Sequence, residues 1–367
     1  MKKVVLMCQQ GVPFETSPAR YQLVYELKQK GYEIYVFNLG NIAYQENRKD
    51  IDYFFNTLRI SNKRIREKIK KLEPDFIIAF TDEDIRVLFP LIWLMKKVSF
   101  IYFNLEIYTP ERELNRQKKE NIFWFQVKWR GIFLYNKIME YIFTKKCKMF
   151  IIQDKLREKT AEKYWIKHCN TLLIPNSYIY EKENIIEHDC YGIIYSGILT
   201  RLRLEPMIKE LQMLFNVPLI FSGKSDEWFR IQYNVLHTKH PDMELFEQSL
   251  SPKEHLEFLK KFAVGLVWYS LTNDENENNI GLASGKLFRH LSIGQPVIVS
   301  ASSGLKSIVN RYKLGVVINH ISELSEAYAK IMKNYSKYQK NILYIYKNKF
   351  DYAENIQCFL QKMNEEK

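Results

Sequence analysis

Residues 278–300 read NNIGLASGKLFRHLSIGQPVIVS, and this stretch decides the fold of the second half of the chain. Ser284 is placed to cap a helix that ends at Gly294, and Pro296 then opens an apolar strand that runs to Ser300. A helix that leads directly into a buried-type strand is one step of an alternating α/β chain. The stretch therefore predicts a parallel sheet covered by helices.

The same alternation of strand and helix continues on both sides of this stretch. We expect strands at 3–7, 34–37, 76–80, 100–103 and 149–152 in the first half, and at 193–196, 218–222, 243–247, 264–268, 297–300 and 316–318 in the second. At 367 residues the chain exceeds the size at which single cores usually stop growing. The predicted fold class is α/β, with two Rossmann-like doubly wound domains facing a cleft.

The domain boundary is expected after the run LLIPNS at 172–177, because a polar, acidic segment separates it from the next strand. We therefore predict an N-terminal domain over 1–175, which binds the acceptor, and a C-terminal domain over 176–335, which binds the donor. Residues 336–367 read as helix with no strand to cover, so we expect them to return towards the N-terminal domain.

Composition narrows the class of protein further. A formal charge of +13 favours an anionic partner, either nucleic acid, an anionic membrane or a phosphorylated small molecule. The five cysteines and seven histidines show no disulfide or metal spacing. No apolar stretch approaches the length of a membrane span, and the start MKKVVLMCQQG lacks a full signal-peptide pattern, so the expected location is the cytoplasm.

Ligands of open parallel sheets bind beyond the carboxyl ends of the strands. In YSGILTRLRLEP (195–206), a strand ends at Gly197 and a helix opens near Arg203, an arrangement that suits a diphosphate. Gly285 would let a phosphate approach the helix capped by Ser284, with Lys286 as the neutralising charge. A plain glycine turn with solvated arginines, and a lysine that faces solvent, are the alternative interpretations.

The run 281–300 resembles the donor segment of GT-B glycosyltransferases that modify bacterial polysaccharides and capsules, of the family 4-like type. The resemblance extends along nearly the whole chain through a Gly11 loop, PDFIIAF (74–80), NLEIY (104–108), LLIPNS (172–177), YSG (195–197) and GLVWY (265–269). It implies a nucleotide-sugar donor, UDP- or GDP-linked, and neither a cofactor nor a metal ion.

By that resemblance, Arg203 and Lys286 hold the donor diphosphate, Phe246 and Glu247 flank the base, and Tyr269 borders the sugar pocket. The donor-binding residues implied are Gly197, Arg203, Gly223, Phe246, Glu247, Tyr269, Ser284, Gly285, Lys286, Leu287 and Arg289.

The sequence departs from the family pattern at Arg289, where many relatives have a ribose-binding glutamate, and at Ile198, where many have an arginine. These departures imply altered nucleotide handling, a different subfamily or loss of activity.

Two loops of the first half are candidates for binding the acceptor. In FNLEIYTPERE (103–113), Glu106 is placed to orient or deprotonate an acceptor hydroxyl beside Asn104. A structural role for Glu106, bonding loop amides, is the alternative. In GVPFETSPAR (11–20), Gly11, Glu15 and Arg20 offer acceptor contacts, although a helix cap explains most of this loop.

Two further segments are rich in charge. The acidic loop TNDENENNIG (272–281) lacks the spacing of a calcium site, so we expect it to be solvated or mobile. From 116 to 148, aromatic residues are interleaved with cations, which suits contact with an anionic membrane on its inner face. The residues are Phe123, Trp124, Phe125, Trp129, Phe133 and Tyr135 with Lys118, Lys119, Lys128, Arg130, Lys145 and Lys146. A buried helix with basic edges is the alternative.

The function that follows is metal-independent transfer of a sugar from a nucleotide sugar to a polysaccharide or lipid-linked saccharide, with Glu106, Arg203 and Lys286 as catalytic residues. The main rival is a catalytically inactive relative that binds sugar nucleotides or glycans. Nucleic-acid binding is supported by charge alone, because no motif accompanies it. A nicotinamide enzyme would need a Gly-x-Gly-x-x-Gly turn, which neither half contains.

Overall fold

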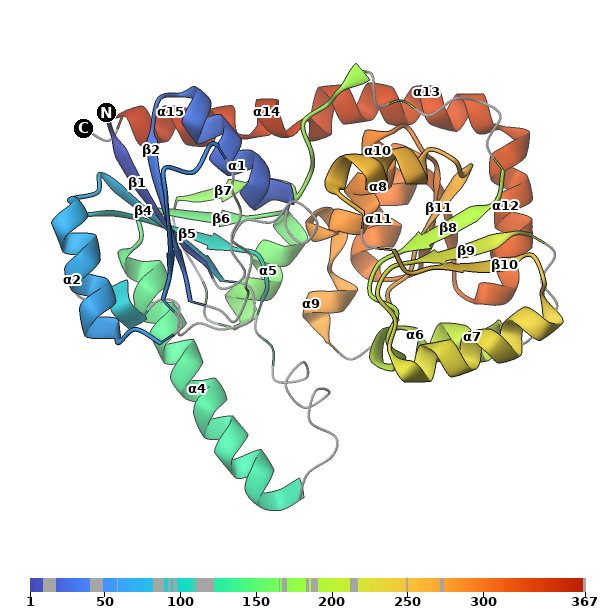
Figure 1. Ribbon diagram of the computed structural model, residues 1–367, viewed down its shortest axis with the longest axis horizontal. Coiled ribbons are helices and arrows are strands. Elements are labelled where there is room, and N and C mark those ends of the chain that lie inside the picture. The colour runs from blue at the N-terminus through green and yellow to red at the C-terminus, as the bar shows by residue number, and fades with distance from the viewer. Residues whose placement is uncertain are drawn as a thin grey trace. The chain divides into compact units, whose positions relative to one another are not determined.

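A computed structural model describes residues 1–8, 18–39, 49–57, 59–81, 89–91, 94, 98–107, 109, 122–164, 166, 170–182, 185, 191–211, 217–248, 250–270 and 274–365. The chain forms two compact units, shown in Figure 1. Unit 1 consists of Met1–Pro175, Asp274–Asn276 and Asn355–Lys367. Unit 2 consists of Asn176–Asn273 and Glu277–Glu354.

Unit 1 is built on a seven-stranded parallel sheet of order β3-β2-β1-β4-β5-β6-β7. Its strands are β1 (Lys3–Cys8), β2 (Glu33–Asn38), β3 (Tyr53–Asn56), β4 (Phe76–Thr81), β5 (Ser99–Asn104), β6 (Met149–Ile152) and β7 (Thr171–Leu173). Apolar residues of α2 (Asn62–Leu72), α4 (Ile122–Lys146) and α5 (Lys155–Lys163) pack on one face of this sheet. In Figure 1, α1 (Pro18–Gln29) and α15 (Gln357–Glu365) lie over the other face.

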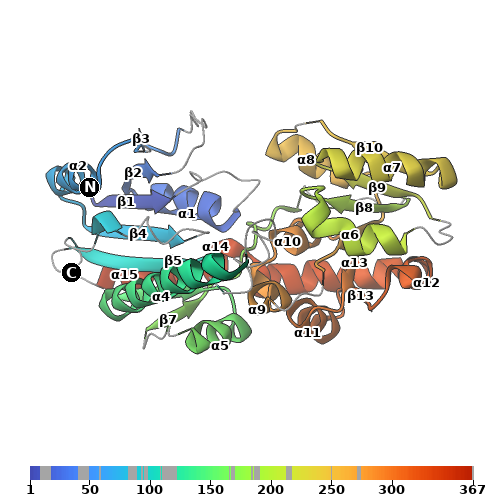
Figure 2. The same ribbon diagram turned by 90° about the horizontal axis from the view of Figure 1, so that it is seen from below.

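Unit 2 contains a six-stranded parallel sheet of order β10-β9-β8-β11-β12-β13, which Figure 2 shows from one edge to the other. Its strands are β8 (Ile193–Ser196), β9 (Leu219–Ser222), β10 (Met243–Phe246), β11 (Val264–Val267), β12 (Val297–Ser300) and β13 (Gly315–Ile318). The central strands are apolar on both faces, as expected of a parallel sheet covered by helices on each side.

Alternate residues of β8 show how the helices of unit 2 divide between the two faces of its sheet. Ile193 and Tyr195 belong to the core with α6 (Arg201–Glu210), α7 (Glu227–Lys239) and α12 (Leu324–Lys333). Ile194 faces the other way and packs with residues of α8 (Pro252–Leu259) and the end of α10 (Gly285–Ser292). The remaining helical elements are α9 (Glu275–Asn278), α11 (Ser303–Tyr312), α13 (Tyr335–Ile345), a π-helical turn (Tyr346–Phe350), α14 (Tyr352–Asn355) and 3₁₀ turns at Gly281–Ala283 and Ile321–Glu323.

Side-chain caps define the start of several helices in both units. The side chains of Ser61, Asp154, Asp226 and Ser251 each accept a hydrogen bond from the backbone N–H three residues later. These bonds satisfy amides that the helix itself leaves without a partner. The first turn of each helix is therefore fixed by its local sequence.

The predicted fold class, two doubly wound α/β domains, is confirmed, and every predicted strand is present. Two strands were not predicted, β3 and β7, and both lie at the edges of the unit 1 sheet. They are short and only partly buried, so they lack the continuous apolar run that identifies a central strand. β7 includes part of LLIPNS, the run that we used to place the domain boundary.

The carboxyl-terminal segment divides between the two units. Residues up to Glu354, including α13, belong to unit 2, and the chain joins unit 1 only from Asn355. In unit 1, the side chain of Asn364 accepts hydrogen bonds from Tyr32 and Lys2, at 3.2 and 3.4 Å. The switch to unit 1 thus comes later than the expected position 336. No helix in the described part of the chain is long and apolar enough to span a bilayer.

Gly265 of β11 gives a test of how tightly α10 packs on its sheet. A methyl group at this position would lie 2.4 Å from the ring of buried His290, whose Nδ1 is 2.6 Å from Gln295 Oε1. We predict that Gly265→Ala lowers the free energy of unfolding by about 2 kcal/mol, because the ring cannot move without losing this bond. Urea unfolding of the full chain measures the change.

Gly131→Ala is the matched control, since no described atom beyond the neighbouring residues and the backbone of α4 itself lies within 4 Å of the added methyl group. Alanine in the middle of α4 should leave stability unchanged or raise it slightly. Equal stabilities for Gly265→Ala and the unmodified protein would contradict the tight packing of α10.

Candidate functional site

The carboxyl ends of three neighbouring strands meet in unit 2 at two glycines. The amide of Gly197 donates to the carbonyl of Ser222 at 2.9 Å, and the amide of Gly223 donates to that of Phe246 at 3.0 Å. A Cβ on Gly223 would lie 1.9 Å from the carbonyl oxygen of Gly197, so only glycine allows the two loops to approach. This close packing leaves backbone, without side chains, at the strand ends.

The amino end of α10 lies at the same edge of the sheet. Ser284 is fully buried and its Oγ accepts the amide of Leu287 at 3.2 Å, so the predicted cap is confirmed. The Ser284 carbonyl accepts the amide of Phe288. Among the described residues, this leaves the amides of Gly285 and Lys286 as the donors at the end of the helix that can meet a ligand. The helix dipole favours an anion there.

Lys286 extends from the first turn of α10 towards the strand ends. Its Nζ donates to the hydroxyl of Tyr195 at 2.8 Å. It also lies 4.7 Å from the ring centroid of Tyr195 and 4.9 Å from that of Tyr269, within the range of cation–π attraction. A Cβ on Gly197 would be 2.8 Å from Lys286 Cε. The ammonium group therefore lies directly over the predicted phosphate-binding turn.

The charge of Lys286 is poorly solvated. Burial lowers its pKa to about 7, and the nearby positive charges of Arg203 and Arg289 act in the same direction, while Glu277 opposes them. Burial likewise raises the pKa of the Tyr195 hydroxyl, so Tyr195 stays neutral. A poorly solvated ammonium group with other positive charges nearby favours the binding of an anion beside it.

Arg203 lies in the first turn of α6, which begins after Thr200. Its side chain is exposed, and its carbonyl accepts a hydrogen bond from Ser270 Oγ at 3.0 Å. The guanidinium charge also acts on Tyr195 and on Lys286. Two helix starts thus bring cations to the same edge of the unit 2 sheet.

Tyr269 connects the end of β11 to α10. Its hydroxyl is 3.2 Å from Ser284 Oγ, and its amide and carbonyl are both hydrogen-bonded to Ser300 Oγ, at 3.0 and 2.9 Å. The ring is held in place beside Lys286 by these contacts. Tyr269 was predicted to border the sugar pocket, and its fixed position is compatible with that role.

The residues predicted to flank the base, Phe246 and Glu247, lie at the end of β10. Phe246 stacks on Phe258 of α8, with 4.3 Å between ring centroids. Glu247 accepts hydrogen bonds from Ser225 and forms an ion pair with Arg230 at 3.1 Å. The bonds from Ser225 and then from Arg230 lower the pKa of Glu247. A carboxylate engaged in this way has a structural role in the loop.

Arg289 lies in the last turn of α10, and its Nε donates to the hydroxyl of Tyr178 at 3.3 Å. Ile198, the other departure from the family pattern, is 48% exposed and so contributes little to the core. Sequence reasoning missed His255, whose Nε2 is 2.9 Å from Ser196 Oγ at the end of β8. Burial and the charge of Arg289 lower the pKa of His255 to about 3, so this histidine is neutral at ordinary pH.

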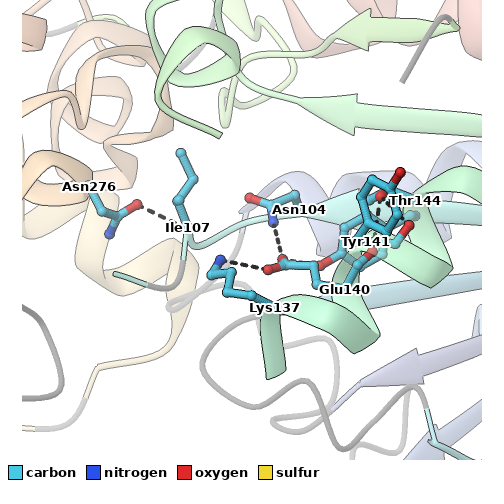
Figure 3. A network of polar contacts seen from close by, with 8 residues as sticks. Asn104, Ile107, Lys137, Glu140, Tyr141, Thr144 and Asn276 are labelled. Atoms are coloured by element: carbon cyan, nitrogen blue, oxygen red, sulfur yellow. Dashed lines mark hydrogen bonds and ion pairs between the residues drawn. The ribbon is translucent and has the colours of Figure 1, made fainter. Parts of the chain in front are cut away.

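In unit 1, Glu106 lies beyond the end of β5 and is bound by a distant part of the chain. Its Oε2 accepts the side-chain amide of Asn276 at 2.8 Å. Asn276 Oδ1 in turn accepts the amide of Ile107 at 3.0 Å (Figure 3). Thr109 donates to Asp274 at 2.8 Å. Glu106 therefore bonds another loop through its carboxylate, in agreement with the structural role that was its alternative interpretation.

These contacts correct one expectation. The acidic loop 272–281 was expected to be solvated or mobile, but Asp274 and Asn276 are 2% and 1% exposed and are part of unit 1. The polar side chains of this loop satisfy the backbone of the Glu106 loop, a long-range role that its composition does not reveal.

Asn104, the last residue of β5, is fully buried. Its Nδ2 donates to Glu140 of α4 at 3.4 Å, and Glu140 also accepts bonds from Tyr102 and Lys137, each at 2.7 Å (Figure 3). The Oδ1 of Asn104 has no partner among the described residues. Asn104 can thus offer an acceptor atom at the strand end.

The other predicted acceptor loop is described only in part. Gly11 and Glu15 lie outside the described residues. Arg20 is 1% exposed, and its guanidinium carbon lies 5.7 Å from the ring of Phe80. Within the described parts of the chain, no three His, Cys, Asp or Glu side chains are grouped as metal ligands.

Comparison with known proteins gives one family match and several matches in fold. Residues 200–349 match the family model of the glucosyltransferase 3-like C-terminal domain. The structure superposes on HepE of Anabaena in complex with UDP-glucose (TM-score 0.71, 11% identity, 100% of both chains). It also superposes on WaaG, a glycosyltransferase involved in lipopolysaccharide biosynthesis (0.67, 11%, 98% of both chains). A third match is the UDP-forming trehalose-phosphate synthase of Burkholderia vietnamiensis (0.69, 9%, 100% of both chains).

The chain has the GT-B glycosyltransferase fold. The GT-B part of the resemblance noted in the sequence is confirmed, because the structural matches cover both units and the family model covers most of unit 2. The family 4-like assignment stays a prediction. No curated protein sequence matches the chain. Within the GT-B fold, the residues predicted for the donor, from Gly197 to Arg289, all belong to unit 2.

The low pKa of Lys286 can be measured directly. Burial disfavours the charged amine, so we predict that its reaction with an acylating reagent follows a titration midpoint near 7. Competitive labelling followed by mass spectrometry gives this midpoint for each lysine. Lys155 is the reference, because its hydrogen bond to Glu158 raises its pKa. A midpoint for Lys286 as high as that of Lys155 would show that its ammonium is well solvated.

Proposed function

We propose that this chain transfers a sugar from a UDP-linked donor, bound by unit 2, to a polysaccharide or lipid-linked saccharide acceptor bound by unit 1, without a metal ion. The observation that carries the proposal is the partly desolvated ammonium group of Lys286, which lies over the Gly197 turn at the amino end of α10. A diphosphate is the ligand whose charge and shape match a lysine, an exposed arginine and free helix amides together.

The same groups would perform the chemical work at the donor. Sugar transfer develops negative charge on the leaving nucleoside diphosphate, and positioned cations stabilise that charge. Lys286 and Arg203 supply positive charge, and the amides of Gly285 and Lys286 supply hydrogen bonds. The choice of uridine is supported by the HepE complexes with UDP and UDP-glucose and by the UDP-forming synthase.

The acceptor would bind beyond the carboxyl end of β5. Glu106 carries a carboxylate that is bonded to Asn276, and Asn104 carries a buried amide oxygen without a described partner. Carboxylate and amide oxygens accept hydrogen bonds from sugar hydroxyls. The involvement of WaaG in lipopolysaccharide biosynthesis supports an acceptor of cell-surface polysaccharide or capsule biosynthesis, reached from the inner face of the membrane.

Substitution of the two cations tests the donor site. We predict that Lys286→Met and Arg203→Met each weaken UDP binding by roughly ten- to a hundredfold, because each removes a charge-assisted contact worth about 1.5–3 kcal/mol. Both should retain the unfolding transition of the unmodified chain. Titration calorimetry with UDP measures affinity, and release of UDP from a panel of UDP-sugars measures turnover.

Lys306→Met is the control for the loss of one positive charge, since Lys306 is exposed on α11. It should bind UDP like the unmodified chain. Unchanged affinity in both Lys286→Met and Arg203→Met would rule out the proposed donor site. UDP binding without turnover of any UDP-sugar would instead identify the chain as the catalytically inactive relative that Arg289 suggests.

Donor binding should also be linked to proton uptake. Free Lys286, with a pKa of about 7, is largely neutral near pH 8, and a bound diphosphate raises its pKa. Binding near pH 8 then takes up one proton, and UDP affinity falls by up to about tenfold for each pH unit above 7. Calorimetry in buffers of different ionisation enthalpy counts the proton.

The nearby histidines do not contribute to this effect, because burial lowers the pKa of His255 to about 3 and that of His290 to about 4. Burial raises the pKa of Tyr195, so its hydroxyl also stays protonated at these pH values. The Lys286→Met variant should therefore bind UDP without proton uptake. Equal proton uptake in the variant would assign the effect to another group.

A further inference from the structure

The outer face of α4 carries an exposed apolar stripe with a cation at each end. Leu134, Ile138 and Tyr141 are 48%, 45% and 40% exposed, at the i, i+4, i+7 spacing of one helix face. Arg130 and Lys145 continue the same stripe one turn before and one turn after, and both are exposed. In Figure 1, the amino-terminal half of α4 extends beyond the strands of its own unit.

The stripe itself contains no acidic residue. The only acidic residue of α4, Glu140, is 3% exposed and lies on the opposite side, paired with Lys137 at 2.7 Å. Lys145 Nζ lies 4.6 Å from the ring centroid of Tyr141, so the cation and the aromatic ring are held together. An apolar centre with basic ends matches the chemistry of an anionic lipid surface.

We propose that this outer face of α4 docks on a bilayer that contains anionic lipids. The apolar side chains of the stripe enter the headgroup region, and Arg130 and Lys145 contact lipid phosphates. The proposal rests on the proposed function, since a lipid-linked acceptor requires the chain to work at a membrane. A second copy of the chain fits less well: symmetric antiparallel pairing of two α4 helices would place Arg130 opposite Lys145 of the other copy.

The inner side of the same helix joins it to the predicted acceptor site. Glu140 accepts hydrogen bonds from Tyr102 and Asn104 of β5 as well as from Lys137, all buried (Figure 3). Breaking such a buried pair would leave an uncompensated charge, so α4 is fixed to β5. A membrane bound to the outer face would then lie at a set position relative to the loop that carries Glu106.

The structure also changes which residues we assign to the membrane face. Phe133, one of the aromatic residues predicted for this role, is partly buried and packs edge-on against Tyr164 at 6.4 Å. Tyr135 remains 52% exposed, as predicted. The lysines at 118 and 119 and the side chains of 122–129 lie outside the described parts of the chain. The face is therefore defined by Leu134, Ile138 and Tyr141.

Co-sedimentation of the full chain with vesicles tests the proposal. The unmodified chain should bind vesicles of phosphatidylglycerol and phosphatidylcholine, bind them less at high salt, and show little binding to phosphatidylcholine alone. Leu134→Glu/Ile138→Glu should lower the partition coefficient on anionic vesicles by at least about tenfold, because it adds repulsion and removes apolar contact. Both positions are exposed, so the fold should persist.

Ile231→Glu/Val235→Glu is the matched control, with the same spacing and the same added charge on exposed positions of α7 (54% and 48%). It should bind vesicles much more strongly than the α4 variant. Absence of binding by the unmodified chain at low salt, or equal loss in both variants, would overturn the proposal. The proposal would also be overturned if light scattering showed that the unmodified chain self-associates and that the α4 variant does not.

UDP calorimetry on the same preparations separates this proposal from the proposed function. The α4 variant should bind UDP like the unmodified chain, because α4 belongs to unit 1 and the donor residues belong to unit 2. Vesicle binding without UDP binding would remove the proposed function and leave the docking face in place. UDP binding without vesicle binding would remove the docking face and leave the proposed function in place.

Discussion

Lys286 lies at the amino end of α10, directly over Gly197, which has no side chain. Several other residues of unit 2 make this position of the ammonium group possible. Gly197 leaves room for the ammonium group, and Gly223 lets the next loop close against Gly197. Tyr195 accepts its hydrogen bond from within the core. Gly265 admits the ring of His290, which lets α10 lie close to the sheet. An ammonium group in this environment costs free energy to keep charged, and a bound anion would relieve that cost.

The alternation of apolar strands and amphipathic helices was enough to predict both sheets, because parallel strands buried on both faces produce apolar runs that a sequence reveals. The helix cap at Ser284 was predictable for a related reason, since capping depends on a few neighbouring residues. β3 and β7 escaped prediction because edge strands are short and half-solvated. Local sequence patterns thus predicted the central strands and the Ser284 cap, because these depend on residues close together in the sequence.

The missed parts of the candidate site depend on contacts between residues far apart in the sequence. His255 reaches Ser196 across unit 2, and Tyr178 receives the bond from Arg289, yet nothing in their own segments marks them. Asn276 is the clearest case, because an acidic, Asn-rich loop has the composition of a solvated segment. Its burial follows from two bonds to the Glu106 loop, one with the amide of Ile107 and one with the carboxylate of Glu106.

The same segment gives the chain an unusual connectivity. Unit 1 takes Asp274–Asn276 from the middle of unit 2's sequence, so the chain leaves unit 2 after β11 and returns to it just before α10. Asn276 bonds the loop that holds Glu106, and only residues 277–283 separate it from Ser284, the cap of the helix that carries Lys286. The loop of Glu106 and the capped start of α10 are therefore joined through a short stretch of backbone, although they belong to different units.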